Sequence, residues 1–383
     1  MRKIAIVTGT RAEYGLLKPL ISKVNQDKNL ELQLLVTGMH LSPEFGMTIN
    51  EIEDDGFPVI KKAEVLLSSD TGVGVIKSMG LTMISFSEAL TELKPDIVIV
   101  LGDRTEIFSV VISAYTLGIP VFHISGGETT EGAYDEGIRH AITKMSYLHF
   151  TSTALYQKRV IQLGESPDRV FNVGAIGIDS IKSLKLLNKQ EFEKSIDFKL
   201  YKKSVLITFH PVTLENVTAK SQFSELLKAL DTLEDTSLIF TKPNSDKDGR
   251  IIINMIDDYV SKNNEKAIAF ISLGQLRYLS AIKHVDVVVG NSSSGITEVP
   301  VFKKPTINIG DRQKGRLMPE SVINCMPNQL DIEKAMEQSL SSNFMEQIQN
   351  QENPYGNGDT AEQIMEILKK TNIKSIKKSF YDL

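Results

Sequence analysis

Residues 286–316 read DVVVGNSSSGITEVPVFKKPTINIGDRQKGR, which predicts a strand, a turn, a helix and a second strand. The apolar run Val287–Val289 ends at Gly290, and the small residues 291–295 follow before a helix can begin. Such a strand-to-helix turn presents backbone N–H groups and small hydroxyls to an anion, and the helix dipole favours negative charge there. The stretch therefore predicts an anion site, with an ordinary serine-rich turn as the alternative.

Charged residues accompany this turn. Glu298 follows within the first helical turns, where its carboxylate can accept hydrogen bonds from sugar hydroxyls. Arg312 and Arg316 lie just past the second strand, and either guanidinium can neutralise a phosphate. An anion site, a carboxylate and two arginines in one stretch predict a nucleotide site.

The alternation of strands and helices continues along the whole chain and predicts an α/β fold of doubly wound parallel sheets. A length of 383 residues exceeds one ordinary core and indicates two domains. The glycine-bearing segment 174–177 is the best candidate for a hinge between them. The expected strands are Ile4–Val7, Leu32–Val36, Ile97–Leu101, Val121–Ile124, Leu148–Thr151, Val205–Phe209, Leu238–Phe240, Ile268–Ile271, Val285–Val289 and Thr306–Ile309.

The two halves of the chain also contain similar sequence patterns. Residues 96–102 (DIVIVLG) resemble residues 286–290 (DVVVG), and each run is followed by a helix, another apolar strand and a glycine turn. Two doubly wound domains that face each other would bring these strand ends to one central cleft, where ligands of such sheets bind. Chance similarity is the alternative, because buried parallel strands share one composition.

Composition is that of a soluble globular protein, with 41% hydrophobic and 24% charged residues. A net charge of −5 offers no basic surface for nucleic acid. The lone Cys325 excludes an intramolecular disulfide, and no cysteine–histidine cluster suggests zinc. The apolar run after Met1 predicts a first strand, not a signal peptide, and no apolar run is long enough to span a bilayer. We therefore expect a cytoplasmic protein that binds neither nucleic acid nor membrane.

Two strand ends in the first half carry candidate site residues. Arg11, in the turn after the first strand, can reach a phosphate, or it can pair with Glu13 or another acid. This turn has neither a GxGxxG fingerprint nor a Walker lysine. Asp103 and Arg104 follow a buried strand. At such a position Asp103 can act as a general acid or base, and Arg104 can hold a negatively charged group. Asp103 is also a favoured residue for capping the helix that follows.

A glycine-bearing loop after His123 gathers acids. Glu128, Glu131 and Asp135 precede a helix that holds Arg139. Paired carboxylates in a partly dry cleft split their pKa values and can divide acid and base duties. Acids near a helix start are also routine complements of its dipole, so the cluster predicts catalysis better than any one acid does.

Two strand ends in the second half add candidates. His210 closes a strand before a proline, where it can donate to a phosphate or act as a general acid. Asn244 ends another strand and can touch a nucleotide, although its Asn-Ser-Asp run also suits a turn. A polar break at 349–360 precedes a last helix over Ala361–Lys370, and the lysines beyond it, including Lys378, are expected to be solvated.

In combination these motifs resemble the hydrolysing UDP-N-acetylglucosamine 2-epimerases, specifically the bacterial NeuC type of sialic acid biosynthesis. The resemblance runs from the first strand to about residue 320. It is carried by TGTRAEYG (8–15), VTGMHLSPEFG (36–46), LGDRTEIFS (101–109), HISGGE (123–128), YDEGIRHAITKMSYLHFTST (134–153), GNSSSG (290–295) and INIGDRQKGR (307–316).

The resemblance implies a GT-B-like architecture. Rossmann-like domains over residues 1–173 and 174–355 would face a central cleft, and a helix in 356–383 would cross back to the first domain. The implied reaction eliminates UDP from UDP-N-acetylglucosamine to give a glycal and adds water to release N-acetylmannosamine. The implied partners are the UDP-sugar, UDP and further copies of the chain in a homodimer or homotetramer. No nicotinamide, metal or other cofactor is implied.

The resemblance also implies roles for individual residues. Asp103, Glu128 and Asp135 would be the catalytic acids, and His210 would assist departure of the phosphate. Glu298 would hold the ribose. The implied nucleotide contacts are Arg11, Arg104, His210, Asn244, Ser292, Ser293, Glu298 and Arg312.

One departure from the family pattern concerns Ser125. Non-hydrolysing relatives and the animal sialic acid enzyme carry Glu at this position, two residues after the histidine of the strand. The chain therefore resembles the NeuC branch, with the division of labour among Glu128, Glu131 and Asp135 open. A hydrolysing 2-epimerase of UDP- or GDP-linked N,N'-diacetylbacillosamine (legionaminic acid route) is the nearest alternative. A non-hydrolysing epimerase, a GT-B glycosyltransferase and a silent nucleotide-sugar sensor are more distant ones.

Overall fold

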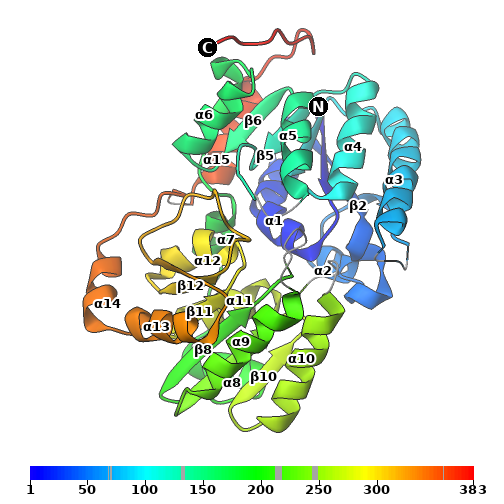
Figure 1. The fold of residues 1–383 in the computed structure, drawn as a ribbon. Coiled ribbons are helices and arrows are strands. Elements are labelled where there is room, and N and C mark those ends of the chain that lie inside the picture. Colours follow the sequence, from blue (N-terminus) through cyan, green and yellow to red (C-terminus); the bar gives the residue numbers. More distant parts are fainter. Residues whose placement is uncertain (68, 70, 131–133, 212–217, 244–248, 357) are drawn as a thin grey trace. The chain divides into compact units, whose positions relative to one another are not determined.

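The chain forms two compact units, each built on a parallel sheet (Figure 1). The structure is a computed structural model that describes residues 1–67, 69, 71–130, 134–211, 218–243, 249–356 and 358–383. Unit 1 comprises Met1–Glu128, Asp135–Lys182 and Tyr355–Leu383, and unit 2 comprises Thr129–Tyr134 and Ser183–Pro354. The predicted fold class of two parallel α/β sheets is confirmed. The candidate hinge at 174–177 lies inside unit 1, and the chain passes to unit 2 at Ser183.

The sheet of unit 1 has the strand order β3-β2-β1-β4-β5-β6-β7. Both of its faces are covered: in β1, Ile4 and Ile6 belong to one apolar cluster, and Ala5 and Val7 to another. Strands buried on both faces appear in the sequence as continuous apolar runs. The strands are β1 (Arg2–Thr8), β2 (Leu30–Thr37), β3 (Val59–Ala63), β4 (Ile97–Leu101), β5 (Val121–Ile124), β6 (Leu148–Thr151) and β7 (Val170–Asn172).

Helices of unit 1 connect these strands and cover the sheet. They are α1 (Arg11–Gln26), α2 (Ile49–Asp54), α3 (Gly72–Leu93), α4 (Thr105–Thr116), α5 (Asp135–Met145), α6 (Ala154–Gln162), α7 (Gly177–Ser183) and α15 (Thr360–Lys370), with 3₁₀ turns η1 (Gly38–Leu41), η2 (Pro43–Phe45) and η3 (Pro167–Arg169). The last helix, α15, packs against α1.

Unit 2 repeats this plan with the strand order β10-β9-β8-β11-β12-β13. Its strands are β8 (Lys203–Thr208), β9 (Thr236–Thr241), β10 (Ala267–Phe270), β11 (Val287–Gly290), β12 (Thr306–Ile309) and β13 (Val322–Cys325). Its helices are α8 (Lys189–Ile196), α9 (Ala219–Asp231), α10 (Gly249–Lys262), α11 (Gly274–His284), α12 (Ser294–Thr297), α13 (Gln329–Ser339) and α14 (Ser342–Gln349), with the 3₁₀ turn η4 (Val299–Phe302).

The similar sequence patterns of the two halves correspond to the same strand topology in both sheets. In each sheet the fourth strand, β4 or β11, pairs with the first strand, β1 or β8. The aspartate before each fourth strand makes the same contact: Asp96 Oδ2 accepts from the backbone N of Lys3 at 2.7 Å, and Asp286 Oδ2 from that of Ser204 at 2.8 Å. A matched side-chain contact at the same place in both sheets does not follow from composition alone, so chance similarity is the weaker explanation.

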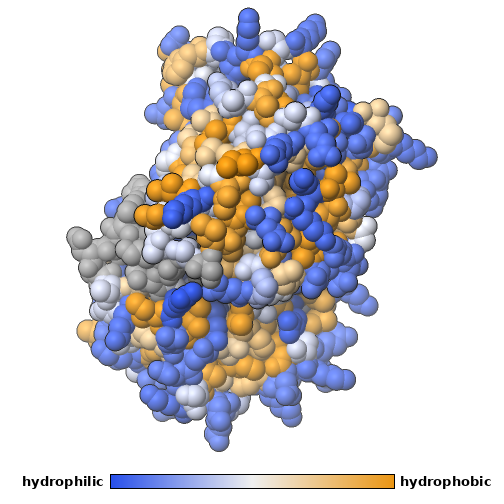
Figure 2. All heavy atoms as spheres, turned by 90° about the vertical axis from the view of Figure 1, so that its right-hand side faces the viewer, coloured by the Kyte–Doolittle hydropathy of each residue, from blue (hydrophilic) through white to orange (hydrophobic). Residues whose placement is uncertain are grey.

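α3 exposes an apolar stripe. Val73, Ile76 and Ile84 are 63%, 68% and 61% exposed and lie on one side of the helix by their spacing. Phe86 and Leu90 are buried, and the helix packs against α4. Apolar side chains gather over this side of unit 1 in Figure 2. Among the described residues α3 is the one helix long and apolar enough to cross a membrane by length and composition, so the statement that no run is long enough was wrong.

The C-terminal tail is anchored. Lys378 Nζ donates to Glu165 Oε2 at 2.7 Å, and Glu165 Oε2 lies 3.0 Å from His149 Nε2. The Phe380 ring lies against Gly164, where a Cβ would approach it to 2.4 Å. The side chain of Lys378 is only 16% exposed, so the prediction of a solvated lysine at this position was wrong.

Candidate active site

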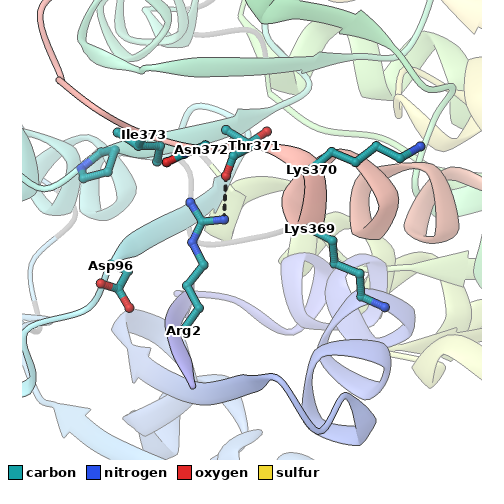
Figure 3. Close-up of a pocket in the computed structure, with 8 residues that line it drawn as sticks. Arg2, Asp96, Lys369, Lys370, Thr371, Asn372 and Ile373 are labelled. Carbon is teal, nitrogen blue, oxygen red and sulfur yellow. Dashed lines mark hydrogen bonds between the residues drawn. The ribbon is translucent and has the colours of Figure 1, made fainter.

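A hollow among the described residues lies away from the predicted site. It has a volume of about 600 Å³ and is lined by Arg2, Asp96 and Lys369 among others (Figure 3). Arg2 begins β1, and its Nη1 donates to the carbonyl oxygens of Leu368 and Thr371, both at 2.9 Å, at the end of α15. The hollow is thus at the amino ends of the strands, whereas ligands of doubly wound sheets bind at the carboxyl ends. The candidate site is therefore expected at the carboxyl ends of the strands.

A pair of carboxylates lies beside Arg104 at the end of β1. Glu13 Oε2 accepts from the backbone N of Gly9 (2.8 Å) and of Thr10 (3.2 Å), and Glu106 Oε1 accepts from Arg104 Nε at 2.8 Å. Burial raises the pKa of Glu13 to about 8, and the charge of Glu106 adds to this. Burial opposes ionisation of Glu106 too, but Arg104 lowers the pKa of that carboxyl below its ordinary value. Near neutral pH the pair therefore holds one proton and one negative charge beside Arg104.

Arg11 is paired with an acid that the sequence did not single out. It begins α1, and its Nε and Nη2 contact Glu51 Oε2 at 2.8 Å and Oε1 at 2.7 Å. Of the two sequence hypotheses for Arg11, the structure shows the ion pair with an acid other than Glu13. The pair is partly exposed, so it is weak and a phosphate can compete with it.

A tight turn places Asp103 at the end of β4. Gly102 has a positive φ of 76°, and its carbonyl oxygen accepts from His123 Nε2 at 2.8 Å. Burial lowers the pKa of His123 to about 3, so the ring is neutral and carries its proton on Nε2. Arg104 is the N-cap residue of α4, and its side chain makes no capping bond. The alternative that Asp103 caps this helix is therefore wrong.

Arg139 of unit 1 makes hydrogen bonds to three acidic residues. Its side chain is 2% exposed, and its guanidinium donates to Asp103 Oδ2, to Glu136 Oε2 at 2.8 Å and to the carbonyl oxygen of Glu128 at 2.9 Å. Burial lowers the pKa of Arg139, but the charges of Asp103, Glu128 and Glu136 outweigh it and raise that pKa. A buried cation thus joins the end of β4, the acid loop and α5.

The other acids predicted as site residues are Glu128, Glu131 and Asp135. Glu128 is 8% exposed, and its Oε1 accepts from Ser152 Oγ at 2.9 Å. Asp135 is the first residue of α5, one helical turn before Arg139. Glu131, like the predicted nucleotide contact Asn244, lies outside the described residues. The structure therefore brings Asp103 and Glu128 to one guanidinium and adds Glu136, which the sequence did not single out.

In unit 2, Asn291 joins three strand ends. Its Nδ2 donates to the carbonyl oxygen of His210 at 2.8 Å, and its Oδ1 accepts from the backbone N of His210 at 2.7 Å. The carbonyl oxygen of Asn291 accepts from Arg312 Nη1 (3.0 Å) and Gln313 Nε2 (2.8 Å). These bonds fix two predicted residues, His210 and Arg312, at the carboxyl ends of β8, β11 and β12.

The turn after β11 depends on Gly290. Its φ is 142°, and a Cβ there would lie 1.9 Å from the carbonyl oxygen of Thr208. The helix that follows, α12, has only four residues, so the expected contribution of a helix dipole is small. Ser292 and Ser293 are half-buried in the turn, where hydroxyls and backbone N–H groups remain the anion donors.

Glu298 follows α12 and is half-buried, and burial raises its pKa. Tyr278 of α11 lies near it: burial raises the pKa of the Tyr278 hydroxyl, and the charge of Glu298 raises it further. A carboxyl group with a raised pKa can both donate and accept hydrogen bonds, which suits a sugar hydroxyl. Tyr278 could not be singled out from sequence, because a tyrosine on an amphipathic helix usually belongs to the core.

The residues that the sequence missed have a common property. Arg139, Glu136, Glu13 and Glu106 all lie within helices, whereas the predicted site residues were sought in the turns after strands. The signal available was the spacing of Glu136 and Arg139 by three residues, which places both on one side of α5. Among the described residues no group of three His, Cys, Asp or Glu side chains could hold a metal ion.

Comparison with known proteins identifies the family. The family model described as UDP-N-acetylglucosamine 2-epimerase matches residues 22–369. The GDP/UDP-N,N'-diacetylbacillosamine 2-epimerase (hydrolyzing) of Campylobacter jejuni is 48% identical over 343 residues, which are 90% of this chain and 88% of that protein. Polysialic acid biosynthesis protein P7 of Escherichia coli is 41% identical over 387 residues, covering 100% and 98%.

A solved structure shows the same fold. The UDP-GlcNAc 2-epimerase of Neisseria meningitidis, bound to UDP-GlcNAc, superposes with a TM-score of 0.82 at 21% identity, covering 96% of this chain and 100% of that one. At this identity the likeness supports the fold alone, and the GT-B-like fold class is confirmed by it. The family model matches most of the chain, and two relatives are more than 40% identical over at least 88% of their length. The chain therefore belongs to the UDP-N-acetylglucosamine 2-epimerase family.

Proposed function

We propose that this protein is a hydrolysing nucleotide-sugar 2-epimerase that releases UDP and the free 2-epimer of a 2-acetamido sugar. The observation that carries this proposal is the cluster around Arg139, whose buried guanidinium contacts the carboxylate of Asp103 and the main-chain carbonyl oxygen of Glu128. The Campylobacter relative is named as a hydrolysing enzyme, which supports water as the second reactant.

The elimination step requires stabilisation of the charge on the leaving diphosphate more than it requires a strong base. The proton on C2 is barely acidic, so cleavage of the C1–O bond runs ahead and its electron pair leaves with the diphosphate. Asp103, held by Arg139, removes the C2 proton, and the C–H electrons form the C1=C2 bond of the glycal. A proton then adds to C2 on the face opposite to the one from which the first proton left, and the C1=C2 electron pair forms the new C2–H bond. Water adds to the resulting cation at C1 and releases a proton, which gives the free 2-epimer.

The other predicted residues fit supporting roles in this scheme. His210 and Arg312, held by Asn291 in unit 2, stabilise the departing diphosphate, since cations and N–H groups there lower the barrier to C1–O cleavage. Ser292, Ser293 and Glu298 hold the nucleotide. Glu128 and Asp135 are assigned to proton transfer during hydration.

For the sugar, we propose UDP-N,N'-diacetylbacillosamine ahead of UDP-N-acetylglucosamine. The sequence motifs favoured N-acetylglucosamine, but they describe the nucleotide end of the site. The relative named for diacetylbacillosamine is 48% identical and the polysialic acid protein is 41% identical, which supports the reverse order.

The test is to incubate the protein separately with UDP-N-acetylglucosamine, UDP-N,N'-diacetylbacillosamine and GDP-N,N'-diacetylbacillosamine. Nucleotide release is followed by chromatography and the sugar product by NMR. We expect free UDP and a free 2-epimer, with kcat/KM for the diacetylated UDP-sugar at least tenfold above that for UDP-N-acetylglucosamine. A UDP-linked 2-epimer would indicate a non-hydrolysing enzyme, and no nucleotide from any substrate would reject the proposal.

We also propose that the protein self-associates, as a homodimer or homotetramer, through the apolar stripe of α3. Val73, Ile76 and Ile84 are exposed on a helix whose Phe86 and Leu90 are buried in unit 1. Ile76→Lys is expected to lower the mass measured by light scattering, whereas Ile271→Lys, at a site 78% exposed in unit 2, should leave it unchanged. A monomeric wild-type protein would reject this proposal.

A further inference from the structure

The two arginines of the GDRQKGR stretch do different things. Arg312 contacts the carbonyl oxygen of Asn291 at the end of β11. Arg316 instead donates from Nε to the carbonyl oxygen of Thr129 at 3.1 Å, and its Nη2 lies 3.4 Å from Thr130 Oγ1. The sequence hypothesis treats both arginines alike, as partners for a phosphate. The structure separates them.

Thr129 and Thr130 directly follow the acid Glu128. The segment Thr129–Tyr134 clusters with unit 2, while Glu128 before it and Asp135 after it cluster with unit 1. Consecutive carbonyl oxygens in this segment accept from different arginines: that of Glu128 from Arg139, and that of Thr129 from Arg316. Because one peptide unit separates the two oxygens, fixing Thr129 restricts where the backbone of Glu128 can lie.

We propose that Arg316 is a positioning residue that ties the acid-bearing segment to the nucleotide-binding unit. This inference rests on the proposed function. Arg316 holds the main chain next to Glu128, and it shares the turn after β12 with Arg312, so occupation of the nucleotide site is coupled to the placement of an acid needed for turnover. A guanidinium suits this task because it presents several donors in a fixed plane to neighbouring acceptors.

The experiment compares Arg316→Gln and Arg316→Lys with Arg312→Gln as the matched control. Affinity for UDP is measured by calorimetry, and kcat is measured for nucleotide release. For Arg316→Gln we expect kcat to fall at least tenfold while the Kd of UDP changes less than threefold. For Arg312→Gln we expect the Kd of UDP to rise at least tenfold. Arg316→Lys should not restore kcat, because a single ammonium cannot reproduce the fork.

Two further readouts separate positioning from a general loss of structure. The isotope effect with substrate deuterated at C2 should rise in Arg316→Gln, because proton transfer becomes slower relative to the other steps. In the protein without nucleotide, backbone amides of the peptide carrying Glu128–Thr130 should exchange with deuterium at least threefold faster than in wild type.

The inference is overturned if Arg316→Gln weakens UDP binding as much as Arg312→Gln does, with kcat unchanged, since Arg316 would then be a phosphate ligand. Equal amide exchange in wild type and Arg316→Gln would also overturn it. If the wild-type protein releases no nucleotide from any sugar, the proposed function fails, but the exchange comparison still decides whether Arg316 holds this segment.

Discussion

Replacing Glu13 by Gln should stabilise the protein by an amount that grows with pH. The folded pKa of Glu13 is about 8, against an ordinary value of 4.5. Between these values the folded protein holds a proton that the unfolded chain has released, so the stability contribution of Glu13 is lost as pH rises through this window. Glutamine cannot ionise, and its side-chain oxygen can still accept from the backbone N of Gly9 and Thr10.

The expected gain in free energy of unfolding follows from the pKa shift of Glu13. A change from 4.5 to about 8 corresponds to at most about 5 kcal/mol once both states are ionised. Glu106 and Arg104 share the charge with Glu13, and their adjustment reduces the effect, so we expect about 2 kcal/mol between pH 4 and pH 9. The observable is the difference in free energy of unfolding between variant and wild type, because any change in helix capping is the same at every pH.

The assay is urea unfolding followed by far-UV circular dichroism at intervals from pH 4 to pH 9. Glu165→Gln is the matched control, a second buried glutamate of unit 1 with the opposite shift. Burial opposes its ionisation, but His149, Lys144 and Lys378 lower the pKa of Glu165 to about 2. Its stabilising contribution is present above pH 4.5 and is lost as pH falls toward 2, so Glu165→Gln should be destabilised by a constant amount from pH 6 to pH 9. Parallel curves for Glu13→Gln and wild type would refute the shared proton.

Four further predictions follow from single sites. Asp103→Asn should abolish nucleotide release and leave the Kd of UDP by calorimetry within a few fold; an equal loss of affinity would mean that Asp103 positions the nucleotide or the fold. Gly290→Ala should lower the free energy of unfolding by at least about 3 kcal/mol, because its Cβ would meet the carbonyl oxygen of Thr208, and an unchanged urea midpoint would contradict this. Lys378→Met should cost about 1–3 kcal/mol in the same assay, since its buried acidic partner loses a donor; a value near zero would show that the tail is not anchored there. Burial raises the pKa of Cys325 to about 12, so a thiol-specific disulfide reagent at pH 8 should label the native protein far more slowly than the protein in urea, and equal rates would disprove it.

The central strands of both sheets were predictable to within one or two residues at most ends. Val121–Ile124 and Thr306–Ile309 have the predicted bounds. Both lie between other strands, so each is buried on both faces and has an unbroken apolar sequence. The missed strands, β3, β7 and β13, are at sheet edges, where burial is partial and the apolar run is interrupted or short. These three edge strands therefore lack the pattern on which sequence prediction depends, whereas the edge strand β10 has an apolar run and was predicted to within one residue.

The candidate site was predictable where it depends on strand ends. Asp103, Arg104 and His210 follow apolar strands, and carboxyl ends of parallel strands share one edge of their sheet, so their positions could be inferred from sequence order. The ion-pair partner of each charged residue was not predictable from sequence. Arg11 pairs with Glu51 and not with its sequence neighbour Glu13, because the folding of the chain decides which acid lies within reach.

The sequence by itself determined the fold class, the family resemblance and the strand ends at which the candidate residues lie, because each of these depends on local periodicity or on short motifs. Only the tertiary structure decided how the charges are grouped. Arg139 reaches Asp103 across 36 residues, and Arg316 reaches Thr129 across 187. The raised pKa of Glu13 arises from burial and from a second carboxylate on another helix. Desolvation and long-range pairing depend on distances in space, and local sequence does not specify those distances.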